Sequence, residues 1–364
     1  MSDAVLLKPD VPFIKNVLKG GGGDLKKCYQ CATCSVACAL SPDEAPFPRR
    51  QMIRAQWGLK DQLMGDPAIW LCHNCGDCST RCPRGARPGD LLGALRSEAI
   101  KHFAFPGFIG TLFGTPGGIV LLFLAGAAAF GLLSLSGPLM QGTAGAEFEF
   151  ANMFPLPSLE AFFFGLSGLL LIAFAGGLVR FTKALRASGA DAPLLSGLVP
   201  AVGLILSHRR FGECGAERAR YYGHLATLWG FLGLAVVGTL VGIATMAGVL
   251  ETPLSQTNAL KILANASGAL AIVGVLILLG DRLRDPVKRA SSTLFDWFFI
   301  WTLTGVLVTG MAIQFLRLAE AAPWMYVVYF VHLVLIFALF VGAPYTKFAH
   351  LAYRTVAMAA AGRK

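Results

Sequence analysis

Eight of the nine cysteines stand in two runs of identical spacing, and this spacing is the strongest chemical signal in the chain. Each run has the form C-x2-C-x2-C-x3-C. The first three thiolates of such a run can converge on one [4Fe-4S] cubane, while the fourth points away and binds the other cluster. We therefore expect two [4Fe-4S] clusters with crossed ligands. One set is Cys28, Cys31, Cys34 and Cys82, and the other is Cys72, Cys75, Cys78 and Cys38.

Two other uses of cysteine fit this spacing less well. Structural zinc sites take four ligands, usually as two pairs, and need no third cysteine between the pairs. Disulfides are disfavoured because the basic loops described below indicate a cytoplasmic location, where thiols stay reduced. The ninth cysteine, Cys214, stands apart from both runs. We expect it to be a free cytoplasmic thiol.

The composition indicates that most of the chain lies in a lipid bilayer. Its 364 residues are 55% hydrophobic and 14% charged, which is too apolar for an ordinary soluble protein. The formal net charge is +10, but the basic residues beyond the cysteine segment cluster between hydrophobic stretches. They therefore indicate membrane topology and no nucleic-acid partner. The polar start of the chain lacks the apolar core of a secretory signal, so we expect nothing to export the cysteine segment.

The pattern of polar and apolar stretches predicts an all-α protein in three parts. Residues 1–105 are expected to form a small α-helical ferredoxin domain, with one helix over 49–64 and the clusters replacing part of a hydrophobic core. Residues 106–158 hold a first transmembrane helix and a periplasmic loop, and 159–364 hold five further spans. The six stretches long enough to cross about 30 Å of hydrocarbon are 116–136, 159–180, 221–250, 260–280, 294–318 and 323–348. The stretch 194–207 is too short to span, and we expect an interfacial helix there.

The charges of the connecting loops predict the orientation of the bundle. One set of loops is basic and alternates along the chain with a set that is mainly acidic. By the positive-inside rule the basic set faces the cytoplasm, which places both termini and both clusters at the cytoplasmic side of the inner membrane. The basic residues are Arg180, Lys183, Arg186, Arg209, Arg210, Arg218, Arg220, Arg282, Arg284, Lys288, Arg289, Lys347, Arg354, Arg363 and Lys364, and the acidic ones are Glu147, Glu149, Glu251 and Glu320.

Histidines within the apolar stretches are candidate heme ligands. His332 and His350 are eighteen residues apart, which is about five turns of a regular helix, so both are expected on one face, one near each membrane surface. Neutral imidazole is a good axial ligand for heme iron. His224 enters the third span from the cytoplasmic side, at the level of His350. We therefore expect His224 and His350 to hold one b heme near the cytoplasm.

The other two histidines leave alternatives open. His332 has no histidine opposite it, so a second heme there needs a ligand such as Met246 or an open coordination position. It could instead accept a proton from a quinol. His208 could serve a heme only on the cytoplasmic side. Each intramembrane histidine could also be hydrogen-bonded without any metal.

Two known families are similar to the two parts of this sequence. The segment 28–82 resembles the C subunit of heterodisulfide reductases. The part from residue 159 onward resembles the cytochrome b subunit of respiratory nitrate reductases, on Tyr222-Gly-His-Leu and on Tyr329-Phe-Val-His-Leu-Val-Leu through His350. A fusion of the two resembles the QmoC family, the membrane subunits of quinone-interacting membrane-bound oxidoreductase complexes.

The resemblance implies an electron-transfer subunit, not a complete enzyme alone. It implies that electrons pass between menaquinone and two soluble flavin and iron-sulfur partners, QmoA-like and QmoB-like subunits, and through them adenylylsulfate reductase in sulfate reduction. It also implies two b hemes, but Leu234 stands where the related cytochromes have a second histidine. The alternatives are a membrane-anchored redox sensor or docking module, and the equivalent subunit of a heterodisulfide reductase or a sulfite-reduction-linked complex.

Overall fold

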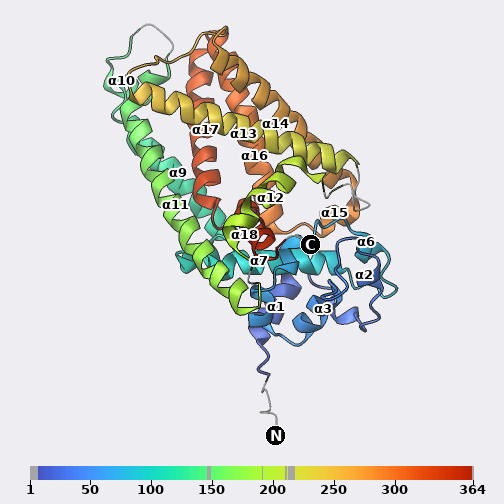
Figure 1. The fold of residues 1–364 in the computed structure, drawn as a ribbon. Helices are drawn as coiled ribbons and strands as arrows, with labels where there is room; N and C mark the ends of the chain where they lie inside the picture. The colour runs from blue at the N-terminus through green and yellow to red at the C-terminus, as the bar shows by residue number, and fades with distance from the viewer. Residues whose placement is uncertain (1–6, 146–148, 191, 210, 212–217, 363–364) are drawn as a thin grey trace.

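The computed structural model describes residues 7–145, 149–190, 192–209, 211 and 218–362. All regular secondary structure in these residues is helical, which confirms the predicted fold class. Figure 1 shows a bundle of long helices standing on a domain of short helices. Five residues named above lie outside the described residues: Glu147, Arg210, Cys214, Arg363 and Lys364.

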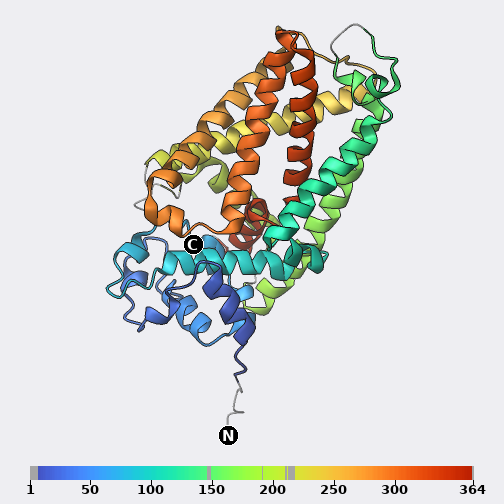
Figure 2. The ribbon, with the colours of Figure 1, turned by 180° about the vertical axis from the view of Figure 1, so that it is seen from behind.

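The N-terminal domain wraps short helices around the two cysteine runs. Its longest helix, α7, begins with Pro88, which suits a first helical position because the missing N–H would be unpaired there. Figure 2 shows α7, in cyan, lying across the base of the bundle. The elements are α1 (Val11–Lys19), η1 (Leu25–Lys27), α2 (Thr33–Val36), α3 (Arg49–Gln56), α4 (Lys60–Met64), α5 (Ala68–Leu71), α6 (Asp77–Thr80) and α7 (Pro88–Phe103).

The single helix predicted over 49–64 is wrong, because the chain breaks between α3 and α4. Gly58 takes a φ of +68° there, a left-handed conformation that a residue with a side chain adopts at a cost. A Cβ at this position would also lie 2.9 Å from the Ile14 side chain and 3.0 Å from the Asp10 backbone. After the break, both helices still contribute to one core, with Met52 and Ala55 from α3 and Leu63 and Met64 from α4.

The two cysteine loops have the same backbone conformation. Gln30 and Ala32 in the first loop have φ values of 66° and 69°, and Asn74 and Gly76 in the second have 55° and 92°. Each loop then enters a short helix, α2 or α6. The repeated spacing of the cysteines therefore corresponds to a repeated structure, with left-handed residues at equivalent places.

Among the described residues, six helices of the bundle are long and apolar enough to cross a membrane, as predicted. They are α9 (Pro116–Ser134), α11 (Leu156–Ala187), α13 (Arg218–Met246), α14 (Ala259–Arg284), α16 (Leu294–Leu318) and α17 (Ala322–Gly342). The predicted short helix is present as α12 (Leu194–Ser207) and packs against α18 (His350–Ala360). Shorter elements join these helices: α8 (Gly107–Leu112), α10 (Pro138–Gln141), η2 (Phe150–Asn152), α15 (Pro286–Ala290) and η4 (Lys347–Ala349).

The last predicted span is interrupted, so His332 and His350 do not share one helix. α17 ends at Gly342, and α18 begins only at His350. Pro344 in the gap has no N–H to donate, so it cannot extend the hydrogen-bond pattern of α17. The expected common face of His332 and His350 is therefore wrong, because it required a continuous helix.

One hydrophobic core joins the N-terminal domain to the bundle. Trp70 of α5 is 1% exposed and stacks on Tyr353 of α18, with ring centroids 5.3 Å apart. Phe181 of α11 meets the edge of Trp70 at 5.7 Å and packs on Phe103 of α7 at 5.2 Å. Aromatic pairs of this kind add to the stabilisation from buried area. The cysteine domain is therefore fixed to the bundle by packing and not only by the connecting chain.

Hydrogen bonds continue this junction. The Arg180 guanidinium donates to the carbonyl oxygens of Ala104 and His102 at 2.8 and 3.0 Å. The Tyr345 hydroxyl donates to the Phe105 carbonyl at 2.9 Å. The described part of the basic loops thus lies at the end of the bundle that holds the cysteine domain, and the described acidic loops lie at the other end (Figures 1 and 2).

Removing the buried indole should weaken this junction. We expect Trp70→Ala to lower the free energy of unfolding by about 3 to 5 kcal/mol, because it leaves a cavity among rings that cannot close around it. Trp57 is 52% exposed at the end of α3, so Trp57→Ala should cost less than about 1 kcal/mol. Thermal unfolding in detergent, with limited proteolysis of the 1–105 segment, measures both. Equal losses in the two variants would contradict the shared core.

The left-handed loop positions can be tested in opposite directions. Gly76→Ala should lower the free energy of unfolding by about 1 kcal/mol, and Ala32→Gly should raise it by about 0.5 kcal/mol, because only residues with a Cβ are strained there. Apart from its chain neighbours, no described atom lies within 4 Å of a Cβ built on Gly76. The expected loss of stability in Gly76→Ala therefore comes from the backbone conformation and not from a steric clash. Gly107→Ala, at an ordinary φ and equally open, is the control. Thermal unfolding that shifted in the same direction for Gly76→Ala and Ala32→Gly would contradict this account.

Candidate electron-transfer centres

The eight cysteines line two separate hollows in the N-terminal domain. The first, with about 330 Å³ of space, is lined by Cys28, Cys31 and Cys34 of the first run and by Cys82 of the second. The second, with about 400 Å³, is lined by three cysteines of the second run and one of the first: Cys72, Cys75, Cys78 and Cys38. Each hollow therefore brings together the set that the crossed pattern predicts. None of these eight cysteines forms a disulfide.

Hydrogen bonds to sulfur support thiolates in both hollows. The Asn74 backbone N–H donates to Cys72 Sγ at 3.2 Å, and the Ala86 N–H donates to Cys82 Sγ at 3.3 Å. The Gln30 side-chain amide donates to Cys28 Sγ at 3.4 Å. Such donors stabilise sulfur when it carries negative charge, and they raise cluster potentials. Two of them, Gln30 and Asn74, occupy the equivalent left-handed positions of the two loops.

Two of the thiols are buried, which fits a site that binds a metal cluster. Burial, with a smaller effect of the Cys28 thiolate, raises the pKa of Cys34 to about 11. Burial also raises the pKa of Cys78, and the thiolates of Cys72 and Cys75 raise it further. When a metal binds, it displaces the proton of such a buried thiol. The donor set, its division into fours and its burial all fit cubane clusters.

The two hollows differ in their access to solvent. Around the first, Cys31 is exposed, Tyr29 is 58% exposed and Val36 is 88% exposed. At the positions of the second run that correspond to Cys31 and Tyr29, Cys75 is half-buried and His73 is 8% exposed. The first centre therefore faces outward and the second faces the interior of the protein.

Three histidines gather at the same end of the bundle as the second hollow. His208 ends α12, His224 lies in the first turns of α13, and His350 begins α18. Nε2 of His208 and Nδ1 of His224 are 2.7 Å apart. The ring centroids of His224 and His350 are 6.3 Å apart, with the planes at 80°. The predicted proximity of His224 and His350 is present, and His208 joins them at the level where it could serve a heme.

The surroundings of this group keep His350 and His208 neutral. Burial lowers the pKa of His350 to about 4, with smaller contributions from the nearby Lys347 and Arg354 cations. Burial also lowers the pKa of His208. Nδ1 of His350 lies 2.5 Å from the Lys347 carbonyl oxygen, so the Nδ1–H donates to that oxygen. Nε2 then carries no proton and has a lone pair available. A hydrogen bond of this kind fixes the tautomer that binds a metal.

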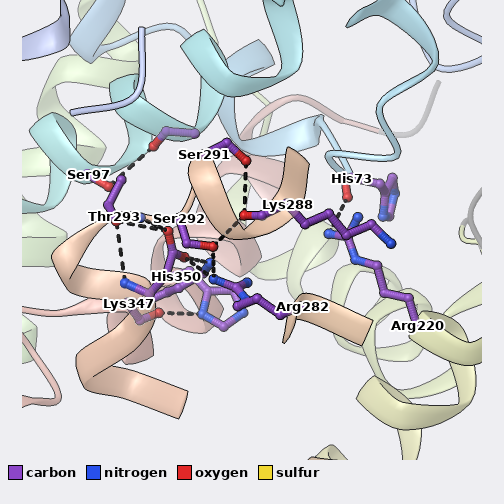
Figure 3. Close-up of polar contacts among 12 residues, drawn as sticks. His73, Ser97, Arg220, Arg282, Lys288, Ser291, Ser292, Thr293, Lys347 and His350 are labelled. Carbon is purple, nitrogen blue, oxygen red and sulfur yellow. Dashed lines mark hydrogen bonds and ion pairs between the residues drawn. The ribbon is translucent and has the colours of Figure 1, made fainter. Parts of the chain in front are cut away.

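A polar network holds the segment that carries the Lys347 carbonyl. The Lys347 ammonium pairs with Asp296 at the start of α16, and Arg282 of α14 lies 3.7 Å from the same carboxylate. Asp296 also forms a capping box with Thr293. Figure 3 shows Lys347 between Thr293 and His350. Charged residues at the ends of α14, α16 and η4 thus position His350 through the Lys347 carbonyl.

His332 lies apart from this group. It stands ten residues from either end of α17, so it is midway along the helix and not near its far end as expected. Its Nδ1 is 2.8 Å from Thr309 Oγ1, and a Cβ on Gly310 would lie 3.1 Å from its ring. Because the Thr309 hydroxyl donates to the Gly305 carbonyl at 2.6 Å, it accepts the proton of His332.

Three residues beside the second hollow, His73, Arg220 and Arg354, are not identified by sequence reasoning. From the sequence His73 has no assigned role, and the two arginines indicate only topology. Arg220 precedes His224 by four residues and Arg354 follows His350 by four, which is about one helical turn in each case. This spacing is the available signal, but it carries meaning only when the cysteine loop is known to lie beside both helices.

Comparisons with known proteins support the iron-sulfur part of this picture. Residues 24–86 match the family described as a 4Fe-4S dicluster domain. The C subunit of the H(2):CoB-CoM heterodisulfide,ferredoxin reductase of Methanothermobacter thermautotrophicus is 41% identical over 93 residues, covering 25% of this chain and 50% of that protein. The C subunit of the ferredoxin:CoB-CoM heterodisulfide reductase of Methanosarcina mazei is 36% identical over 85 residues, 23% of this chain and 52% of that protein. The chain thus spans about half the length of these curated relatives.

A further relative is similar over nearly the whole chain. Citrate utilization protein B of Escherichia coli is 27% identical over 367 aligned residues, covering 92% of this chain and 89% of that protein. No solved structure matches the chain. The N-terminal segment is therefore a 4Fe-4S dicluster domain related to the C subunits of heterodisulfide reductases, and it is followed by a multi-span helical bundle.

Serine substitutions can test the crossed ligation. Because Cys82 lines the hollow of the first run, Cys82→Ser should remove the same paramagnetic resonance signal as Cys31→Ser. It should leave the signal that is lost in Cys75→Ser. Cys38→Ser should behave in the opposite way. Anaerobic preparations with measured iron content provide the comparison, and loss of the Cys75-dependent signal in Cys82→Ser would reject the crossing.

Proposed function

We propose that this chain is the membrane subunit of a quinone-interacting oxidoreductase. It passes electrons between menaquinone in the inner membrane and soluble flavin and iron-sulfur partners in the cytoplasm. A b heme and two [4Fe-4S] clusters carry the electrons. The observation that carries this proposal is that His224 and His350 meet at the bundle end where the second cysteine hollow lies. The basic loops at this end support its assignment to the cytoplasmic side.

The spacing of His224 and His350 suits a heme with two axial imidazoles. Two imidazoles that would hold one metal ion between them, with metal–nitrogen bonds of about 2 Å, would have ring centres roughly 6 Å apart. The centroids here are 6.3 Å apart. The bond from His350 Nδ1 to the Lys347 carbonyl leaves Nε2 for iron. This tautomer supports His350 as a ligand.

His208 supports the same site through His224. If His224 donates its Nδ1 proton to His208 Nε2 across 2.7 Å, His224 Nε2 is left for iron. His208, as a neutral imidazole, then carries its single ring proton on Nδ1. We assign His208 to orienting His224, and His224 with His350 to iron.

The middle of the bundle is assigned to a second heme with one open or non-histidine position, or to the quinone. Leu234, in place of a second histidine, packs with apolar residues of α14 and α16. His332 has Nε2 available once Nδ1 is engaged by Thr309. That nitrogen is positioned either to bind iron or to accept a proton from a quinol.

Chemically, quinol oxidation releases two electrons, and the metal centres accept them one at a time. The chain's own residues hold these centres, exclude water from them and set their potentials by hydrogen bonds. Tyr29 lines the first hollow and is 58% exposed, which supports electron exchange there with QmoA-like and QmoB-like subunits. Adenylylsulfate reductase is assigned as an indirect partner through them.

A second candidate differs in the soluble partner. The similarity to citrate utilization protein B extends over 92% of the chain, and this favours a soluble partner that acts in citrate utilization. The similarity to the C subunits of heterodisulfide reductases is confined to the dicluster domain. Affinity purification from native membranes after cross-linking, with mass spectrometry of the attached proteins, separates the two.

The heme assignment predicts the spectra of histidine variants. The purified protein should show a b-type Soret band that a menaquinol analogue reduces. His350→Ala should remove the heme near the clusters, while His332→Ala should keep it and remove only a second heme. Heme-to-protein ratios measure both outcomes. An unchanged ratio in His350→Ala would reject the pairing with His224, and intact clusters without any heme absorbance would favour a redox sensor or docking module.

A further inference from the structure

Three arginines from three helices converge on the second cysteine loop. Arg96 comes from α7, Arg220 from α13 and Arg354 from α18. All three donate to backbone carbonyl oxygens within residues 69–74. This segment contains the first cysteine of the second run and leads to the next. The charge around the second hollow is therefore supplied by the N-terminal domain and by the bundle together.

Arg220 holds the loop between the two cysteines. Its guanidinium donates to the His73 carbonyl at 3.1 Å and to the Asn74 carbonyl. Figure 3 shows Arg220 extending from α13 toward His73. The backbone N–H of Asn74 in turn donates to Cys72 Sγ. Arg220 thus fixes the peptide that contacts a cluster thiolate.

Arg354 holds the same loop from the other side. It lies 2.9 and 3.0 Å from the two ring nitrogens of His73 and 3.5 Å from the Leu71 carbonyl. It is four residues beyond His350, as Arg220 is four residues before His224. The two helices that carry the proposed heme ligands therefore also hydrogen-bond to the second cysteine loop. Each does so through an arginine about one helical turn from its histidine.

The first cysteine loop has a neutral group in the corresponding place. Arg96 donates to the carbonyls of Ile69 and Cys72, at 2.9 and 3.4 Å. At the equivalent positions of the first loop, 44 residues earlier, the Gln56 side-chain amide donates to the carbonyls of Leu25 and Cys28, at 3.1 and 2.9 Å. The two side chains thus bind the same pair of carbonyls in the two loops. They differ by one full charge.

The remaining charges near the two hollows do not reverse this difference. Arg49 and Arg84 line the first hollow but are exposed to solvent, which screens their effect. Asp77 lines the second hollow, and it offsets one of the three arginines there. Arg96, Arg220 and Arg354 are each half-buried, so their charges act through a medium of lower dielectric constant.

We propose that Arg96, Arg220 and Arg354 are positioning residues that raise the reduction potential of the second cluster above that of the first. Reduction adds negative charge to a cluster, and nearby positive charge stabilises the reduced form. Because Arg220 and Arg354 come from α13 and α18, the second cluster is also the one that lies beside the bundle and exchanges electrons with it. This inference rests on the proposed function, because it takes the two hollows as cluster sites.

Exchanging the two equivalent residues tests the inference. Arg96→Gln gives the second loop the neutral donor of the first and should shift the potential of the Cys75-dependent signal to a lower value. Gln56→Arg should shift the Cys31-dependent signal to a higher value. Each substitution should leave the other signal unchanged. Redox titration with mediators, followed by paramagnetic resonance on the full-length protein, measures both potentials.

Two further variants separate charge from packing. Arg354→Lys keeps the charge and should retain most of the potential, whereas Arg354→Gln should lower it as Arg96→Gln does. Arg186→Gln, at an exposed position of α11 that lines neither hollow, is the control and should shift neither signal. Potentials that stay unchanged in both Arg96→Gln and Gln56→Arg, or that shift equally for both clusters, would overturn the inference. The titration needs no quinol, heme or partner, so a failed quinone proposal would not alter its result.

Discussion

The stack of Trp70 on Tyr353 is the contact on which the arrangement of centres depends. Trp70 lies two residues before Cys72, and Tyr353 lies three residues after His350. Packing these two rings together therefore sets the second cysteine loop and the first residue of α18 at a fixed separation. Phe181 and Phe103 enclose the pair from α11 and α7. A rigid apolar joint of this kind keeps distances between centres constant where a flexible linker would not.

The break between α17 and α18 is part of the same arrangement. A continuous helix would have carried His350 further along the axis of α17, and not to its place beside His224. Because the chain turns after Gly342, α18 can lie against α11, α12 and α5. His350 then faces His224, and Arg354 reaches the loop that contains His73. One interruption thus places a histidine and an arginine of the same short helix on two neighbouring sites.

The two cysteine runs show how a repeated motif acquires two roles. Their loops share left-handed residues at the same positions and hydrogen-bond donors to the same carbonyls. The difference lies in what surrounds them. The first loop faces solvent beside Tyr29 and Val36, whereas the second is enclosed by α7, α13 and α18. Environment, and not the ligand set, distinguishes the two centres.

Much of this protein was accessible from its sequence, because the signals are local. Cysteine spacing predicted how the eight thiols divide between two hollows, since a cubane imposes its own geometry on nearby residues. Runs of apolar residues predicted the six long helices, since a span needs a minimum length of hydrocarbon-compatible side chains. The errors at 49–64 and after Gly342 arose where a glycine or a proline ends a helix that periodicity alone would continue.

Only the tertiary structure decided which distant residues meet. His208 lies within hydrogen-bond distance of His224. Arg220 and Arg354 both contact the loop at His73. Gln56 and Arg96 occupy equivalent positions in the two loops. None of these contacts follows from spacing along the chain. They depend on how α5, α12, α13 and α18 pack around one shared core, and packing is a property of all these side chains together.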